Sequence, residues 1–374
     1  MTTGFRQPAY LANGETFCDT AMRSLLCDGQ APRSVSIGAL SPSIGRQSLA
    51  DARANGNEGG LKTLIKAARH AGFAERLRTE GVDLLYVWRG LGGRDELGAM
   101  AARAAGIPLV FFEGGPMPGW VQIDMQGVNA RSSIPRDAAF FRCWRKDGRH
   151  PRIDWRSLRD TLTVRTPRRK LVGQERRADW SGEGPFLFCP FQMNAPGDPL
   201  PDGGWVADAG DFVAVLAQAA EALPRDWHLR LKPHPNARGT LEPLVARHRG
   251  ARLVIDKDTN SLDQLAASRG VITINSAMGL EAFFYDKPVI VLGASYYSGI
   301  GRTQTAGTVA ELSALLKNPA ALDFDAEARD DLMNFLFNDY FVRDEDLRSH
   351  RFDLSRLLDR HVRHAALTRE VTDG

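Results

Sequence analysis

The sequence predicts an α/β protein built from two Rossmann-like domains, each with a parallel sheet. Short apolar runs alternate with amphipathic segments along most of the chain, which is the pattern of repeated strand–helix units. This alternation occurs in two series, and a segment rich in Arg, Gly and Pro separates them at 115–182. The length of 374 residues also favours two domains over one.

The pattern predicts the elements in order. The first series predicts strands at 34–40, 83–88 and 108–114 and helices near 15–27, 59–80 and 94–105. The second predicts strands at 185–192, 227–233, 251–257, 270–275 and 288–293, with helices at 208–222, 239–248, 261–268, 276–285 and 307–317. We expect an N-terminal domain with its linker at 1–180, a second domain at 181–325, and helices at 326–374, one of which crosses back to the first domain.

Composition and charge exclude several classes of protein. The net charge of +3, from 48 basic and 45 acidic residues, is too balanced for nucleic acid as the main partner. The four cysteines form no CxxC pair, so we expect neither a disulfide framework nor a zinc site. We find no secretory signal and no apolar run long enough to span a bilayer. These features predict a cytoplasmic protein, which would act on a membrane only from its surface.

The segment "WHLRLKPHP" indicates a strand that stops abruptly at a histidine. Its period-2 pattern is typical of a strand, and Pro233 and Pro235 prevent the ladder from continuing. His234 is thus held just beyond the carboxyl end of a strand, where ligands bind in open α/β sheets. We predict that His234 contacts a phosphate, with Lys232 and Pro235 beside it. The alternative is a structural histidine in a turn.

The segment "GVITINSAMGLEAFFYDKPVIVLG" predicts a strand, a tight turn, a helix and another strand. Asn275 or Ser276 would cap the helix, and the start of a helix attracts anions. Gly279 would leave room for a ligand, and Glu281 would reach a ribose hydroxyl. Together they suggest a nucleotide-sugar site. The alternatives are an ordinary helix cap at Ser276 and a surface or packed glutamate at Glu281.

These motifs resemble those of the capsule polysaccharide biosynthesis proteins, a family that includes CMP-Kdo-dependent sugar transferases related to bacterial sialyltransferases. The likeness begins with "KPHP" and "TINSAMGLEAFFYDKPVIVLGASYYSGIGRT". It extends upstream to "FFEGGPMPGWVQIDMQGVNARSSI" and "FCPFQMNAPGDP", so that it covers 108–303. The resemblance implies a GT-B architecture, in which two Rossmann-like domains face each other across a cleft. It also implies a nucleotide-sugar donor, a glycan or glycolipid acceptor, and no metal or other cofactor.

The resemblance also implies roles for individual residues. Glu113 would act as general acid–base, unless it only satisfies loop amides. Asp198 would be the nucleophile of a retaining double displacement, although Asp202 follows closely and an Asp in a Pro/Gly turn is common. Gln192 would orient the donor or satisfy backbone groups at the strand end.

Two departures from the family pattern matter. The sequence has "EGG" where the family often has two acidic residues, so a second carboxylate must come from elsewhere, with Asp124 the nearest candidate. Arg302 lies in the last loop, where its guanidinium would bind the donor's carboxylate or remain solvated. The Gly-containing turns at 41–46 and 89–96 are candidates for acceptor contact.

The tail 348–370 has apolar residues at helical spacing with Arg, His and Asp between them. One interpretation is a helix on anionic lipid at the inner face of the cytoplasmic membrane. We favour the other, a terminal helix docked on the protein.

The sequence as a whole predicts a glycosyltransferase that moves Kdo, or a related nonulosonic acid, from a CMP-activated donor to a bacterial surface glycan. Two alternatives are a transferase or epimerase that uses a UDP- or GDP-sugar, and a non-catalytic protein of capsule assembly or export.

Overall fold

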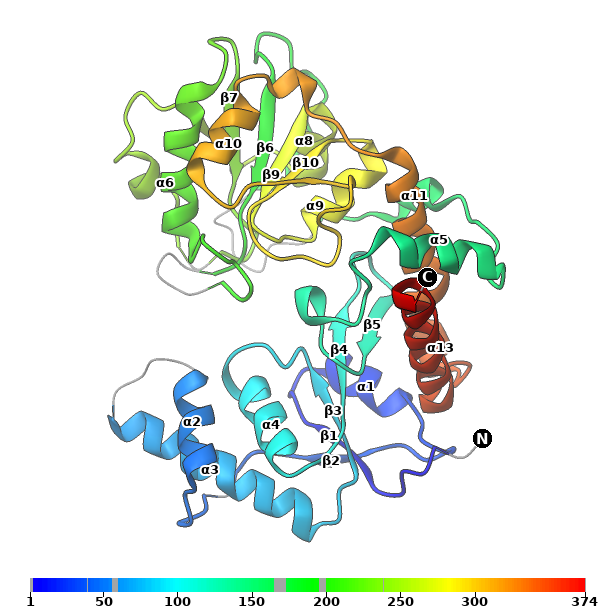
Figure 1. The fold of residues 1–374 in the computed structure, drawn as a ribbon. Helices are drawn as coiled ribbons and strands as arrows, with labels where there is room; N and C mark the ends of the chain where they lie inside the picture. Colours follow the sequence, from blue (N-terminus) through cyan, green and yellow to red (C-terminus); the bar gives the residue numbers. More distant parts are fainter. Residues whose placement is uncertain are drawn as a thin grey trace. The chain divides into compact units, whose positions relative to one another are not determined.

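The computed structural model describes residues 3–38, 40–55, 60–164, 173–194, 200–237 and 239–373. The chain forms two compact units, each with its own six-stranded sheet (Figure 1). Unit 1 contains residues 1–135, 142–151 and 335–374, and unit 2 contains residues 136–141 and 152–334. The predicted α/β class and the two Rossmann-like halves are confirmed. Residues 152–180, which we assigned to the N-terminal domain, lie instead in unit 2.

The sheet of unit 1 has the strand order β12-β5-β4-β3-β1-β2. Strands β1 to β4 pair in parallel, whereas β5 and β12 are antiparallel additions. Their bounds are β1 (Pro8–Leu11), β2 (Arg33–Val35), β3 (Leu84–Trp88), β4 (Leu109–Gly114), β5 (Trp120–Asp124) and β12 (Val342–Arg343). The helices are α1 (Thr16–Ser24), α2 (Arg46–Ala54), α3 (Gly60–Thr79), α4 (Gly93–Ala104), α5 (Ala138–Asp147), α12 (Asp344–Arg348) and α13 (Leu354–Asp373).

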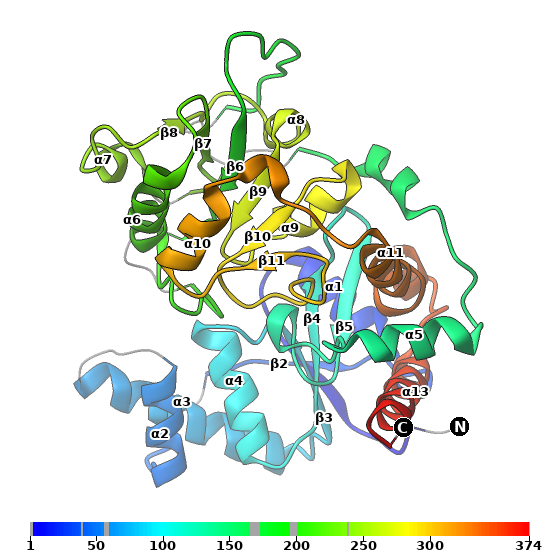
Figure 2. The same cartoon turned by 45° about the horizontal axis from the view of Figure 1, so that its top comes forward.

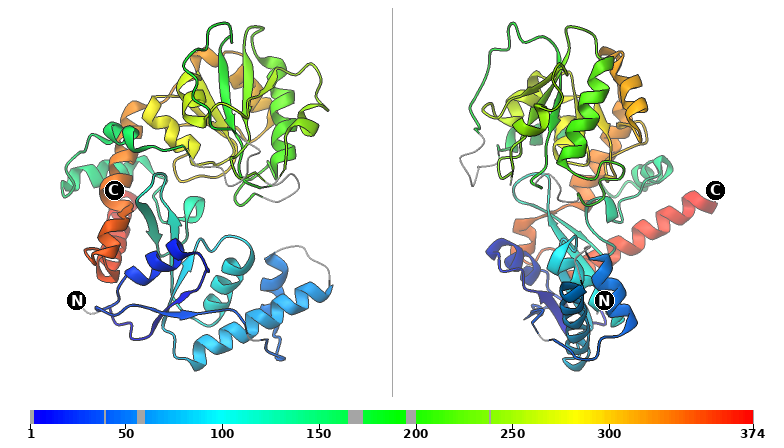
Figure 3. Two further views of the ribbon diagram at one scale, coloured as in Figure 1. Left: turned by 180° about the vertical axis from the view of Figure 1, so that it is seen from behind. Right: turned by 90° about the vertical axis from the view of Figure 1, so that its left-hand side faces the viewer.

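Both faces of this sheet are covered, which explains its continuously apolar strands. Leu84, Tyr86 and Trp88 of β3 point to one face, where they pack with α1, α12 and α13. Leu85 and Val87 point to the other face, where α3 and α4 cover them (Figure 3). The period-2 alternation of a strand therefore divides one apolar run between two cores.

Unit 2 has an entirely parallel sheet with the order β11-β10-β9-β6-β7-β8. Its strands are β6 (Phe186–Pro190), β7 (His228–Lys232), β8 (Leu253–Ile255), β9 (Gly270–Thr273), β10 (Val289–Val291) and β11 (Gln304–Thr305). Its helices are α6 (Ala209–Ala219), α7 (Glu242–Val245), α8 (Ser261–Ala267), α9 (Met278–Glu281), α10 (Val309–Leu316) and α11 (Ala326–Phe335). Helices α6 and α10 pack together over one face, and α8 and α9 lie against the other (Figure 2).

Each sheet has one place where the strand order reverses. In unit 2 the chain runs from β6 through β7 to β8, and then returns to the opposite side of β6 at β9. In unit 1 the reversal lies between β1 and β3. Connections leave such a reversal in opposite directions, and ligands of open α/β sheets bind at the carboxyl ends of the strands there.

The tail returns to unit 1, as the docked interpretation predicts. Leu354 and Leu357 of α13 are fully buried in the core that α1 and β3 share. The side chain of Asp339, in a π-helical turn at Leu336–Tyr340, accepts hydrogen bonds from Trp144 and His364 at 2.8 and 2.9 Å and pairs with Arg363. The apolar stripe of the tail is therefore used within the protein. None of the described helices has the length and apolar character needed to cross a membrane.

Candidate functional site

The carboxyl edge of the unit 2 sheet brings together three of the predicted residues. Register pairs Pro190 with Lys232 and Phe188 with Val271. Gln192 and His234 lie two residues beyond the first pair, and Asn275 lies four residues beyond Val271, as Gln192 does beyond Phe188. Gln192 Nε2 donates to Asn275 Oδ1 at 2.7 Å, across the point where the strand order reverses. The predicted ligand-binding edge thus has a polar link at its centre.

Asn275 also holds a third segment at this edge. Its Nδ2 donates to the carbonyl of Pro201 at 2.9 Å, and the Ala294 amide donates to the carbonyl of Asp202 at the same distance. Residues 200–204 therefore lie against the ends of β9 and β10. Asp202, which sequence reasoning ranked second to Asp198, is brought to the edge by its backbone. Its φ of 55° is left-handed, a conformation that Asp tolerates better than most residues.

His234 begins a tight turn immediately after β7. The Ala237 amide donates to its carbonyl at 2.8 Å, and Pro235 occupies the second position of the turn, where its fixed φ is favourable. The Asn236 amide donates to Nδ1 at 3.0 Å. Since Nδ1 is the acceptor, the proton of the neutral ring lies on Nε2. The turn therefore fixes both the position and the tautomer of this imidazole.

Ser276 lies between β9 and α9, as predicted. Its Oγ accepts from the Met278 amide at 3.3 Å, and its own amide donates to Thr273 Oγ1 at 3.1 Å. The hydroxyl of the buried Tyr297 donates to the Ser276 carbonyl at 2.5 Å. Ser276 is therefore held from both sides by its neighbours.

Our interpretation of Gly279 was wrong. A Cβ at this position would lie 2.3 Å from the Tyr297 hydroxyl oxygen, so the glycine makes room for a tyrosine and not for a ligand. Glu281, in the same helix, is only 7 % exposed. This burial agrees with our alternative interpretation of Glu281 as a packed glutamate. A contact between Glu281 and a ribose stays a prediction.

Lys232 is a structural residue, contrary to prediction, whereas Arg302 is buried and not solvated, and its contact with a donor stays a prediction. Lys232 is 2 % exposed, and its ammonium donates to the carbonyls of Gly173 and Lys257 at 2.9 and 2.7 Å. Burial lowers the pKa of Lys232 to about 8. Arg302 is fully buried, with its guanidinium carbon 4.8 Å from the centre of the Phe141 ring, and burial lowers its pKa to about 10. Neither cation lies at the surface.

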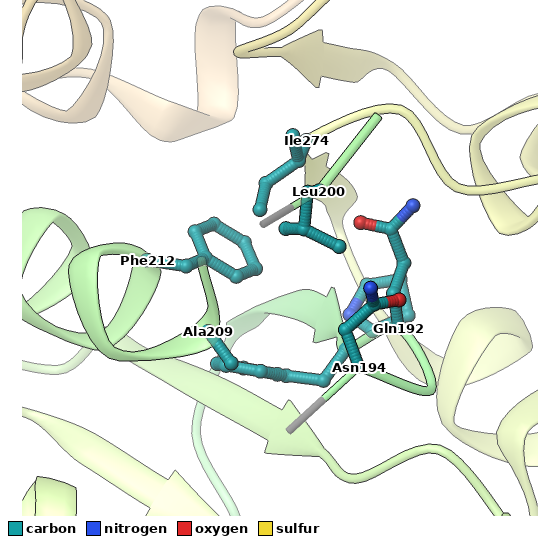
Figure 4. Close-up of a pocket in the computed structure, with 8 residues that line it drawn as sticks. Gln192, Asn194, Leu200, Ala209, Phe212 and Ile274 are labelled. Atoms are coloured by element: carbon teal, nitrogen blue, oxygen red, sulfur yellow. The ribbon is translucent and has the colours of Figure 1, made fainter. Parts of the chain in front are cut away.

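Gln192 also lines a small cavity (Figure 4). Phe212, Leu200 and Ile274 form its apolar side, and Gln192 and Asn194 lie together on the other. Its volume is about 10 Å³, roughly enough for one water molecule. The cavity is therefore too small to hold a nucleotide.

Unit 1 places Glu113 at the corresponding edge of its own sheet. Glu113 is the next-to-last residue of β4, where Arg89 Nε lies 2.9 Å from Oε2 and the Gly114 amide donates to Oε1 at 2.8 Å. Glu113 therefore does satisfy a backbone amide of the loop, which is the role that we named as the alternative to general acid–base catalysis.

The same edge holds a carboxylate that sequence reasoning missed. Asp95, in the first turn of α4, accepts from Asn13 Nδ2 at 3.3 Å across the strand reversal of unit 1. Burial raises the pKa of Asp95, against the lowering effect of Arg94 and Arg89. A carboxyl group with a raised pKa at a strand-end edge is a candidate for function. The available signal was the "RGLGGRDE" turn, in which we noted only the glycines.

Asp124 does not supply the second carboxylate of unit 1. It is 1 % exposed, and its oxygens accept from the amides of Gln126, Gly127 and Ser133, the Ser133 hydroxyl, and the Tyr340 hydroxyl. These five donors occupy the oxygens of a carboxylate, so Asp124 holds its loop. Asp198 lies outside the described residues. Among the residues with described positions, no cluster of His, Cys, Asp or Glu is arranged to hold a metal ion.

The sequence and structure are similar to known proteins. The family model of the capsule polysaccharide biosynthesis proteins matches residues 175–366, more than half of the chain. Protein FixF of Sinorhizobium fredii is 30 % identical over 260 residues, which are 70 % of this chain and 61 % of FixF. The capsule polysaccharide export protein KpsS of Escherichia coli is 23 % identical over 259 residues, or 54 % of this chain and 64 % of KpsS. The chain thus spans less than two thirds of either relative.

Among solved structures, the KpsC β-Kdo 2,7 transferase of Thermosulfurimonas dismutans aligns with a TM-score of 0.47 and 12 % identity. The alignment covers 92 % of this chain and 98 % of that one.

Proposed function

Because the chain belongs to the capsule polysaccharide biosynthesis protein family, we propose that it is a glycosyltransferase that moves Kdo or a related ulosonic acid from a CMP-activated donor to a bacterial surface glycan. The observation that carries the proposal is the link between Gln192 and Asn275 at the strand reversal of unit 2, with His234 at the matching position on β7. Polar groups from three parallel strands meet there, at the edge where open α/β sheets bind nucleotides.

The donor would bind along this edge. His234 carries its proton on Nε2 when neutral, so it would donate to a phosphate oxygen. The hydroxyl of Ser276 would serve as a second donor. Strands in a sheet are about 4.8 Å apart, so β7 and β9 lie about 10 Å apart on either side of β6. His234 and Ser276 would therefore contact the nucleotide from opposite sides, with Gln192 between them.

The chemistry would need two carboxylates. In the retaining route, the Asp198 carboxylate attacks the anomeric carbon of the donor, and the bond from that carbon to the phosphate oxygen breaks to release CMP. Glu113 then takes the proton of the acceptor hydroxyl, whose oxygen displaces Asp198. Arg89 would hold Glu113 ionised for this role as base.

A nucleotide panel tests the donor. We expect CMP to raise the melting temperature more than UDP, GDP or ADP does. Assay with CMP-Kdo and short glycan acceptors should then give a glycoside whose anomeric configuration, read by NMR, matches that of the donor. A preference for UDP or GDP would assign another nucleotide sugar. Absence of both nucleotide binding and CMP-Kdo hydrolysis would support a non-catalytic role in capsule assembly or export.

Two substitutions separate binding from chemistry. Asp198→Ala and Glu113→Gln should each abolish transfer and leave CMP affinity nearly unchanged. Asp202→Ala is the matched control for Asp198→Ala, because Asp202 lies in the same Pro- and Gly-rich stretch. If the Asp202 variant loses transfer and the Asp198 variant keeps it, Asp202 is the nucleophile.

A further inference from the structure

Exposed apolar side chains gather at one place on unit 1. Among the described residues, three of the large exposed apolar side chains lie at the start of α3: Leu61 is 73 % exposed, Leu64 48 % and Ile65 38 %. The others are Phe17, Leu40, Met193, Val254 and Val362, none of which shares a helix or strand with another. Single exposed apolar residues are ordinary, whereas a group on one helix face calls for a partner.

The three residues face outward together because of helix geometry. Positions 61, 64, 65 and 68 lie on one face of a helix, and Thr63, Ala67 and His70 lie on the opposite face, where all three are buried. Further along α3, Phe73, Ala74 and Leu77 enter the core of unit 1. Helix α3 thus buries one face and leaves the apolar start of the other in solvent. We call Leu61, Leu64 and Ile65 the α3 patch.

Helix α2 supports the α3 patch. Helices α2 and α3 pack side by side (Figure 3). The buried His70 of α3 lies 3.1 Å from Ser48 Oγ through Nδ1, and its Nε2 lies 2.7 Å from Asp51 Oδ2. Both partners belong to α2. The two helices therefore present the patch as a rigid pair.

Basic side chains flank the patch. Lys62 and Arg69 are exposed on α3, beside the apolar face, and Arg46 and Arg53 are exposed on α2. Within the described part of the chain, none of these four cations forms an ion pair with a carboxylate. Residues 53–69 contain four basic residues and one acidic residue. An apolar stripe bordered by unpaired cations has the chemistry that binds a surface with acyl chains below anionic headgroups.

We propose that the α3 patch docks unit 1 on an anionic lipid bilayer, with its apolar side chains in the headgroup boundary and the flanking cations on lipid phosphates. The C-terminal helix, the other candidate for this contact, buries Leu354 and Leu357 in the core of unit 1 and leaves Val362 as its one large exposed apolar side chain among the described residues. The proposal does not depend on the donor or on transfer activity, so it can fail or succeed separately from the proposed function.

Vesicle co-sedimentation tests the proposal. The full chain should pellet with vesicles of phosphatidylcholine and phosphatidylglycerol and remain in solution with phosphatidylcholine alone, and salt should weaken the binding. Leu61→Gln combined with Leu64→Gln should lower the partition coefficient about tenfold or more, because two apolar side chains no longer enter the bilayer. Lys62→Glu combined with Arg69→Glu should lower it by a similar factor, since each basic residue near an anionic surface contributes about fivefold.

A matched control is Val362→Gln, which replaces an exposed apolar residue on α13 and should leave binding unchanged. Thermal melts establish that each variant is folded. Absence of binding by the wild-type chain, equal binding to neutral vesicles, or unchanged binding of the α3 variants would each overturn the proposal. Light scattering tests whether a second copy of the chain binds the patch instead of lipid. If the wild-type chain is a dimer and the variant with Leu61→Gln and Leu64→Gln is a monomer, the patch is a dimer interface.

Discussion

The Gln192 side chain donates to Asn275 Oδ1 at 2.7 Å, and Asn275 Nδ2 in turn donates to the Pro201 carbonyl at 2.9 Å. The residues after β6, the loop at Pro201 and the end of β9 thus meet through one asparagine at the strand reversal of unit 2. Unit 1 has a similar arrangement, in which Asn13 after β1 donates to Asp95 of α4 at 3.3 Å. In both units an amide side chain joins the two segments that flank the strand reversal.

The amide link of unit 2 should be measurable as a coupling energy. Asn275→Ala removes two hydrogen bonds and should lower the free energy of unfolding by about 1–3 kcal/mol, and Gln192→Ala should lower it by about 1 kcal/mol. In a double-mutant cycle by urea unfolding, the two losses should fall short of additivity by about 0.5–1.5 kcal/mol. Strict additivity would show that the link carries no energy.

His234 should matter for ligand binding more than for stability. His234→Ala removes a donor to phosphate, so the CMP dissociation constant should rise about tenfold, as expected for the loss of a hydrogen bond to a charged group. Calorimetric titration with CMP measures this change. His248→Ala, which changes a histidine elsewhere in unit 2, should leave the affinity unchanged. Equal effects of the two substitutions would remove His234 from the site.

Asp95→Asn should separate stability from activity. Burial raises the pKa of Asp95, so the folded state holds its proton to a higher pH than the unfolded state does. Stability is therefore lost as pH rises from the unfolded value near 3.9 through the raised value of the folded state. The asparagine variant avoids this loss and should melt higher at pH 7, while transfer to acceptor falls. A lower melting temperature with full activity would make Asp95 a structural residue.

The Asp339 cluster should make unit 1 sensitive to acid. Burial alone would raise the pKa of Asp339, but His364, Arg363 and His150 outweigh it and hold the pKa well below its usual range. Burial also lowers the pKa of His364. Both groups bind protons more readily in the unfolded state, so stability falls below pH 6.5 through His364 and again below about pH 4 through Asp339.

Asp339→Asn tests this account. It leaves the largely buried Arg363 without its partner, so the free energy of unfolding at pH 7 should drop by about 3 kcal/mol, and the further loss in acid should be smaller than in the wild-type chain. Urea unfolding from about pH 2 to pH 7 gives both quantities, because the Asp339 window lies below about pH 4. The exposed Asp359 of α13 provides the control, because Asp359→Asn should keep the wild-type pH dependence. A parallel shift of the whole curve would contradict the assignment to Asp339.

The pattern of apolar residues predicted the strands that lie in the middle of a sheet with helices on both faces. The long apolar runs of β3, β4, β6 and β7 were found within a residue or two of their bounds. Strand β1 escaped notice because four residues, one of them a proline, are too short for a pattern. Strand β5 was missed because it lies in a Gly- and Pro-rich stretch that reads as a linker. Gly115 lets the chain turn there, since a Cβ would lie 2.7 Å from Trp120 Cβ.

The sequence predicted the backbone positions of the site residues better than it predicted the directions of their side chains. Strand ends marked by proline or by asparagine and serine placed His234, Asn275 and Gln192 at one edge, because parallel strands end together. Lys232 looks the same in sequence whether its ammonium faces a ligand or two backbone carbonyls. The role of Gly279 depends on Tyr297, which lies 18 residues later in another loop. These contacts depend on tertiary packing, which local sequence patterns do not predict.

The return of residues 335–374 to unit 1 restricts how this chain can be divided or recombined. Neither half is a contiguous stretch, so neither can be exchanged between homologues as a cassette. A gene truncated after Asn334 would leave β5 without its outer neighbour β12 and strip Leu354 and Leu357 from the core, which would create an aggregation-prone sheet edge. We therefore expect unit 1 to complete its folding only after residues 335–374 have been synthesised.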